Sequence, residues 1–183
     1  MVCNDNGSSY IVLQNFDSNV FAAGSQWTID MWFKLSSNAN NYEYNNLVCQ
    51  TNNSSGNNYL NESIGLGIRY MKLTRYYFAE NCIDSTSAPT LDVSLEKNRW
   101  YHAAVEKMLI NNIWHLFYYL DGNIVCDLPL KKEILPFKSH SVSLPSGSSD
   151  DNGRRFRGLI CRPRISSTAI FGGKNFVVGD RII

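Results

Sequence analysis

The sequence predicts an all-β fold in which two antiparallel sheets pack face to face as a sandwich. Apolar residues recur at every second position in many short segments, and this is the period of a β-strand. Polar turn signals separate these segments, and no stretch has the apolar spacing of a good amphipathic helix. Many short strands joined by polar turns are typical of a two-sheet sandwich.

The range 27–35 shows this alternation most clearly. Its apolar positions fall on one face of the predicted strand, and Thr28, Asp30, Trp32 and Lys34 fall on the other face. Further strands are expected within 63–70, 72–80, 99–107, 113–120, 123–128, 140–144 and 155–165. The core is predicted to include Trp27, Ile29, Met31, Phe33, Leu116, Tyr118 and Ile160.

The range 98–127 predicts three consecutive strands in an antiparallel meander. The chain is expected to turn back at Leu109–Asn112 and again at Asp121–Gly122. An Asp-Gly pair favours a tight hairpin because both residues accept a positive φ at low cost.

Length and composition limit the possible functions. The 183 residues suit one domain with its own core, which we predict over residues 1–183 as part of a larger protein. A net charge of +1 provides no broad field to attract nucleic acid or an anionic membrane. We expect no membrane insertion, because no apolar run of 18 residues is present, and the N-terminus lacks the features of a signal peptide.

Several motifs follow one another in a fixed order along the chain. They lie at 4–13, 27–35, 100–105, 114–122, 156–165 and 164–176. In this order they resemble the laminin-G-like jelly-roll domains of the concanavalin A-like lectin/glucanase superfamily, in the versions found in bacterial and phage surface proteins. In that family an acidic residue usually follows the glycine-x-isoleucine of the 156–165 motif, where this chain has Cys161 and Arg162.

The resemblance implies a non-catalytic module that binds a glycan or a glycosylated surface in adhesion or attachment. The alternative is a structural or assembly module of a virion, tail or surface protein that contacts another protein subunit, and a glycan hydrolase comes third. As part of a larger protein, the chain is expected at a cell surface or on a virion. The one cofactor that the resemblance suggests is Ca²⁺, with Asp5, Asn6 and Asp17 as the nearest candidate ligands.

Hydrolysis is not expected from the polar face of the 27–35 strand. A retaining glycosidase needs two carboxyl groups about 5 Å apart, and Asp30 is the single carboxylate on this face. His102 and His115 could approach each other on neighbouring strands and bind a metal ion, but no third ligand is apparent. A structural role explains His102 more simply.

Two predicted surfaces carry the aromatic and polar groups that suit sugars. The first contains Asp30, Trp32, Arg69 and Arg75 beside a depression left by Gly65 and Gly67. The second is a set of loops with Tyr42, Tyr44, Asn57, Asn58 and Tyr59. The alternative is that other aromatic residues cover Trp32 and that the loops are solvated turns.

The low net charge favours a neutral ligand. Binding of such a ligand should change little with salt, because it gains no long-range attraction. A strong loss of affinity in salt would instead indicate an anion site at Arg154, Arg155 and Arg157, within the single dense basic run of the chain.

The cysteines are predicted to be free thiols. They are five, an odd number, and their spacings match no zinc site. Cys49, Cys126 and Cys161 lie in apolar runs, where a reduced thiol behaves as a small apolar side chain. Thiol titration of the unfolded protein without reductant should find close to five thiols. A count of one would reveal two disulfides and contradict the prediction.

Overall fold

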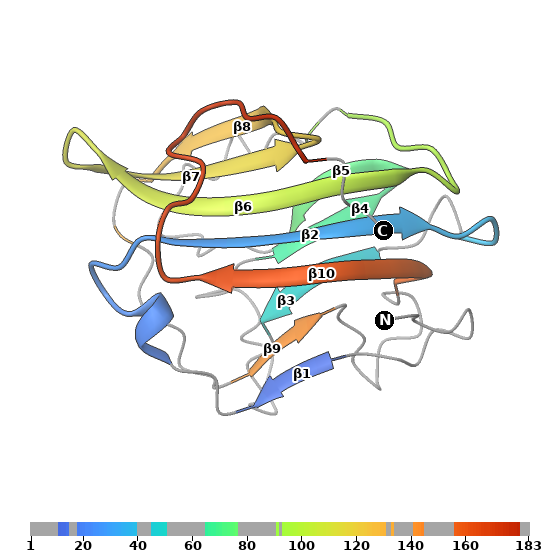
Figure 1. Ribbon diagram of the computed structural model, residues 1–183, viewed down its shortest axis with the longest axis horizontal. Helices are drawn as coiled ribbons and strands as arrows, with labels where there is room; N and C mark the ends of the chain where they lie inside the picture. Colours follow the sequence, from blue (N-terminus) through green and yellow to red (C-terminus); the bar gives the residue numbers. More distant parts are fainter. Residues whose placement is uncertain are drawn as a thin grey trace.

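In the computed structural model, the described residues form two antiparallel sheets of five strands each, and this arrangement confirms the predicted two-sheet sandwich (Figure 1). The structure describes residues 11–14, 18–39, 45–50, 65–76, 91, 93–130, 133, 141–144 and 156–179. A four-residue 3₁₀ helix, η1 (Ser18–Phe21), precedes the strand that begins at Trp27. The described residues contain no helix that is long and apolar enough to cross a membrane.

The two sheets are named here after their central strands. The β3 sheet has the order β1 (Ile11–Gln14), β9 (Ser141–Leu144), β3 (Asn45–Gln50), β4 (Gly65–Arg69), β5 (Lys72–Tyr76). The β6 sheet has the order β10 (Gly158–Ser166), β2 (Trp27–Leu35), β6 (Trp100–Ile110), β7 (Ile113–Leu120), β8 (Asn123–Pro129). The sequence predicts all of these strands except β1 and β3, although some boundaries differ by a few residues.

The core lies between the two sheets and confirms the predicted period-two pattern. Each of the seven predicted core residues is at most 3% exposed. They share one cluster with Leu47, Leu66, Ile68 and Leu73, which come from the β3 sheet. Burial of each large apolar side chain contributes about 1.5–3 kcal/mol, so this layer holds the two sheets together.

Two tight turns connect the β6–β7–β8 meander. Asn111 and Asn112 form the first turn, Asp121 and Gly122 form the second, and all four residues have a positive φ. This conformation matches the natural twist of the flanking strands, and Asn, Asp and Gly adopt it at the lowest cost. Gly122 has a second role, since a Cβ atom there would lie 2.0 Å from the carbonyl oxygen of Phe176.

A third layer covers part of the outer face of the β6 sheet. The chain after β10, residues 167–179, crosses this face as an irregular segment (Figure 1). We call it the C-terminal segment. Its Phe171 and Phe176 rings stack with centroids 3.9 Å apart, and both pack against Tyr119 at 5.2 and 5.5 Å. They form a second apolar cluster with Phe117 and Ala104 that is separate from the main core.

Glu106 anchors the C-terminal segment from beneath. Its carboxylate is fully buried and accepts hydrogen bonds from the backbone N–H groups of Phe171, Gly172 and Gly173 at 2.7, 3.3 and 3.0 Å. The Tyr119 hydroxyl donates to the same carboxylate at 2.8 Å. Gly172 and Gly173 have φ values of +66° and +65°, which turn consecutive N–H groups toward one anion.

Replacement of Glu106 by glutamine should destabilise the protein by about 2–4 kcal/mol, because hydrogen bonds to a buried charge are lost and an amide N–H₂ faces backbone donors. Urea denaturation measures this change. Glu96→Gln is the matched control, because the Glu96 side chain is 74% exposed, and its effect should stay within about 0.5 kcal/mol. Equal stability of the two variants would contradict the anchoring role of Glu106.

Candidate functional site

The outer face of the β6 sheet consists of rows of side chains that run across β10, β2 and β6. Lys34 on β2 lies between Leu159 and Trp100, and Trp32 in the next row lies between Cys161 and His102. Two further rows contain Asp30 and Thr28. The C-terminal segment covers these last two rows, where Asp30 is 5% exposed and Thr28 is fully buried. The rows of Lys34 and Trp32 keep partial exposure.

Asp30 contacts two side chains within the covered part of the face. Arg164 on β10 donates from Nε to one carboxylate oxygen at 2.7 Å, and His102 Nε2 lies 3.2 Å from the other oxygen. The Asp30 side chain is 7% exposed, whereas the Arg164 side chain is 52% exposed. A buried carboxylate requires such partners, because an uncompensated charge in the interior is strongly destabilising. Asp30 therefore fixes edge strand β10 to β2 and β6.

The open part of the face carries two tryptophans and a lysine. We call this surface the tryptophan patch, and it consists of Trp32, Lys34, Trp100, Leu159 and Cys161. The edge of Trp32 meets His102, with ring centroids 5.4 Å apart and an angle of 70° between the planes. The Lys34 Nζ atom lies 5.2 Å from the centroid of the Trp100 ring.

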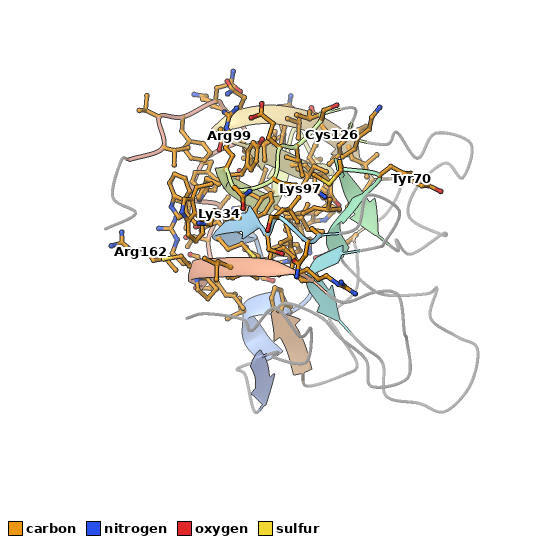
Figure 2. The ribbon with its side chains drawn as sticks, turned by 90° about the vertical axis from the view of Figure 1, so that its right-hand side faces the viewer. Lys34, Tyr70, Lys97, Arg99, Cys126 and Arg162 are labelled. Atoms are coloured by element: carbon orange, nitrogen blue, oxygen red, sulfur yellow. The ribbon has the colours of Figure 1, made fainter. Side chains whose placement is uncertain are left out.

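The tryptophan patch combines two kinds of attraction. The indole faces can receive the C–H surface of a sugar, and the ammonium group can donate hydrogen bonds to its oxygens. Figure 2 views the molecule along the strands, from the end where Lys34, Lys97 and Arg99 lie.

The first predicted binding surface is divided by the structure. Asp30 and Trp32 belong to the β6 sheet, whereas Arg69 lies on β4 in the β3 sheet. The Arg69 position alternates with Leu66 and Ile68, which face the core, so it lies on the opposite outer face of the sandwich. Gly65 and Gly67 share that opposite face. The expectation of one surface with Asp30, Trp32 and Arg69 together is therefore wrong.

The other predicted binding residues lie outside the described residues. These are the loop residues Tyr42, Tyr44, Asn57, Asn58 and Tyr59 and the candidate calcium ligands Asp5, Asn6 and Asp17. Their roles remain predictions. Within the described part of the chain, no three His, Cys, Asp or Glu side chains gather as a metal site.

The two histidines considered as a metal pair lie in different rows. His102 on β6 pairs with Trp32 on β2, whereas His115 on β7 pairs with Met108. The His115 Nδ1 atom lies 2.7 Å from Asp127 Oδ1. The two histidines therefore do not approach each other, because the register separates them by several residues.

Sequence reasoning missed Trp100 and the C-terminal segment. Trp100 stands next to Tyr101, so both faces of the strand are aromatic there and the alternation does not show which side is outward. The register supplies this information, because Tyr101 pairs with Phe33 and stacks on it at 5.6 Å. Trp100 consequently lies on the outer face beside Lys34.

Two five-stranded antiparallel sheets with a shared apolar core define the lectin-like sandwich class. The chain belongs to the laminin-G-like family of the concanavalin A-like lectin/glucanases superfamily, whose sequence profile matches residues 5–172. The resemblance and the fold class predicted from the sequence are thereby confirmed. No curated protein sequence is significantly similar to the chain.

Solved structures with the same fold include binding domains and parts of enzymes. The Ruminococcus gnavus IT-sialidase CBM40 bound to α2,3-sialyllactose is 20% identical with a TM-score of 0.54, over 80% of this chain and 78% of that one. The receptor-binding domain of botulinum neurotoxin D is 14% identical with a TM-score of 0.56, over 90% and 39%. Trypanosoma rangeli sialidase in complex with sialic acid is 13% identical with a TM-score of 0.51, over 81% and 22%.

These likenesses concern the fold. This chain spans about a fifth of the sialidase chains that it matches, since the covered share of those chains is 21–22%. Sequence identity at this level shows a shared fold alone.

The free energy of unfolding should fall at alkaline pH because of Tyr119, which is buried in the covered part of the face. Burial, followed by the hydrogen bond to Glu106, raises the pKa of Tyr119 far above its ordinary value of 10.0. The folded state therefore keeps the phenolic proton at pH values where the unfolded chain releases it. The contribution of Tyr119 to the free energy of unfolding is fully present below pH 10. Above pH 10 it falls by about 1.4 kcal/mol per pH unit.

Urea denaturation between neutral and alkaline pH tests this effect. Tyr119→Phe should lower stability at neutral pH and show a shallower loss above pH 10 than the unchanged protein. Parallel curves for the two proteins would contradict the assignment to Tyr119.

Proposed function

We propose that the chain is a non-catalytic carbohydrate-binding module that recognises a glycan or a glycosylated surface through the tryptophan patch. The observation that carries the proposal is the partial exposure of Trp32 and Trp100 on the part of the β6 sheet that the C-terminal segment leaves open. Aromatic residues are costly to leave in water, so a partly open aromatic surface suits a ligand with its own apolar C–H face.

The comparisons support the same class of function. A carbohydrate-binding module bound to sialyllactose and the receptor-binding domain of a toxin share the fold. Both are binding domains. The carbohydrate-binding module matches this chain over most of the length of both, whereas the sialidases match over a small part of theirs.

The two buried carboxylates of the outer face, Asp30 and Glu106, favour binding over hydrolysis. A retaining glycosidase uses two accessible carboxyl groups about 5 Å apart on either side of the scissile bond. Asp30 is held by Arg164 and His102, and the oxygens of Glu106 accept hydrogen bonds from the C-terminal segment. Both groups thus have structural partners that a catalytic acid or nucleophile would have to lose.

A second candidate function is an assembly module that contacts another protein subunit. At the end of the β6–β7 hairpin, Leu109 and Ile113 are 42% and 49% exposed. These apolar side chains lie away from the tryptophan patch and suit a protein contact. On either proposal, the chain acts as part of a larger protein at a cell surface or on a virion.

A glycan array with the purified chain, followed by titration with the best ligand, tests the proposal. Trp32→Ala and Trp100→Ala should each weaken binding about tenfold, because each removes a stacking surface. Tyr70→Ala is the control, since Tyr70 is a 53% exposed aromatic residue at the β4–β5 turn, and its affinity should be unchanged. Circular dichroism confirms that each variant folds.

Two results would contradict glycan binding at this patch. A silent array together with stable self-association would favour the assembly module. Binding that survives both tryptophan replacements would place the ligand on another surface.

A further inference from the structure

We infer that His102 is a positioning residue of the tryptophan patch: it links the docked C-terminal segment to Trp32 and keeps the indole ring in place for a glycan. This inference rests on the proposed function and adds a regulator of the same patch. The C-terminal segment thereby has a second role besides stability, because it determines how well the open part of the face is ordered.

The His102 side chain lies at the border between the covered and the open part of the face. On the open side its ring meets Trp32, with centroids 5.4 Å apart and an angle of 70° between the planes. On the covered side Phe171 and Phe176 meet the same ring at 6.3 and 5.7 Å, and both are nearly perpendicular to it. These are the distances and angles of favourable edge-to-face contacts. His102 therefore contacts the C-terminal segment and the patch at once.

Hydrogen bonds and a close polar contact hold His102 at this border. Its Nε2 atom lies 3.2 Å from Asp30 Oδ1, and Arg164 Nε donates to the other Asp30 oxygen at 2.7 Å. The His102 N–H donates to the Asp121 carboxylate at 2.9 Å, and the His102 carbonyl accepts from the Asp121 N–H at 2.8 Å. The backbone and one ring nitrogen of His102 are thus fixed.

Packing fixes the rest of the imidazole ring. The Nδ1 atom is buried and has no hydrogen-bond partner within the described part of the chain, and His102 is 4% exposed. The neighbouring rings therefore decide how far the imidazole can tilt. Removal of one of these rings leaves a gap, and the atoms that line a gap lose their contacts outright.

The docked C-terminal segment keeps two of these rings in place. The N–H of Phe171 donates to Glu106 at 2.7 Å, and the N–H of Phe176 donates to the Gly122 carbonyl at 2.9 Å. Both phenylalanines are thus fixed at the backbone, and their rings stack on each other. When they leave His102, Trp32 loses a rigid neighbour. A glycan then has to order the indole as it binds, and this ordering lowers its affinity.

Two variants outside the patch test the inference in the full chain. Phe176→Ala and His102→Ala should each weaken binding of the best glycan from the array about fivefold. The double variant should also weaken binding about fivefold, since both changes act through one contact, whereas a loss of about 25-fold would show two independent effects and overturn the link through His102. Val177→Ala is the control in the same segment, because Val177 is 96% exposed, and its affinity should be unchanged.

Conservative variants separate the ring of His102 from its polar contact. His102→Phe keeps an aromatic ring beside Trp32 and should retain most of the affinity. His102→Gln can still donate to Asp30 but has no ring, and it should lose about fivefold. Asp30 keeps Arg164 as a partner in both variants. The reverse order of affinities would overturn the positioning role of the ring.

A measurement without any ligand tests the same contact. The four tryptophans are labelled as 5-fluorotryptophan, and Trp32→Phe and Trp114→Phe assign two of the fluorine signals. The Trp32 signal should shift and broaden in Phe176→Ala. The Trp114 signal should stay unchanged, because Trp114 packs on the Lys107 ammonium at 4.2 Å, away from His102. An unchanged Trp32 signal would overturn the inference.

The failures of the two proposals can be told apart. Glycan binding with equal affinity in the unchanged protein, Phe176→Ala and His102→Ala would overturn the role of His102 and leave the proposed function intact. A silent glycan array would overturn the proposed function, whereas a shift of the Trp32 signal in Phe176→Ala would still support the link between the C-terminal segment and Trp32.

Discussion

The buried carboxylate of Glu106 determines how the outer face of the β6 sheet is divided. A charge at this depth must find donors within the protein, and the backbone of the C-terminal segment supplies three of them. These N–H groups can point toward Glu106 because two consecutive glycines, Gly172 and Gly173, have a positive φ. The same path of the backbone places Phe171 and Phe176 against Tyr119. The rows of Asp30 and Thr28 are covered as a result, and the rows of Trp32 and Lys34 stay open.

The division of this face also separates Asp30 from the open rows. Asp30 lies in the covered rows, where Arg164 compensates its negative charge. At the position after Ile160, where laminin-G-like domains usually carry an acidic residue, this chain has Cys161 and the exposed Arg162. The covered part of the face therefore provides stability, and the open part carries the binding chemistry that we propose.

The sequence was sufficient to predict the sandwich, its core and the β6–β7–β8 meander, because alternation and turn residues are local signals. It missed β3, whose apolar residues around Leu47 follow an asparagine-rich stretch that indicates a loop. It also grouped Arg69 with Trp32, because alternation identifies the two faces of one strand and does not tell which sheet a strand joins. The bonds from Glu106 to Phe171 and Gly173 span 65 and 67 residues, and no periodicity reports a contact of that range.

The C-terminal segment has a consequence for the order of events during synthesis. It leaves the ribosome after every strand that it covers, and its contact between Thr168 and Thr28 joins positions 140 residues apart. A nascent chain that ends before Phe171 already contains β6 and β7, but Phe117, Tyr119 and the Glu106 carboxylate still face water. Such an intermediate exposes an aromatic strip that other unfinished chains or a chaperone can bind. The outer face of the β6 sheet is therefore covered only after the C-terminal segment, which belongs to neither sheet, has emerged.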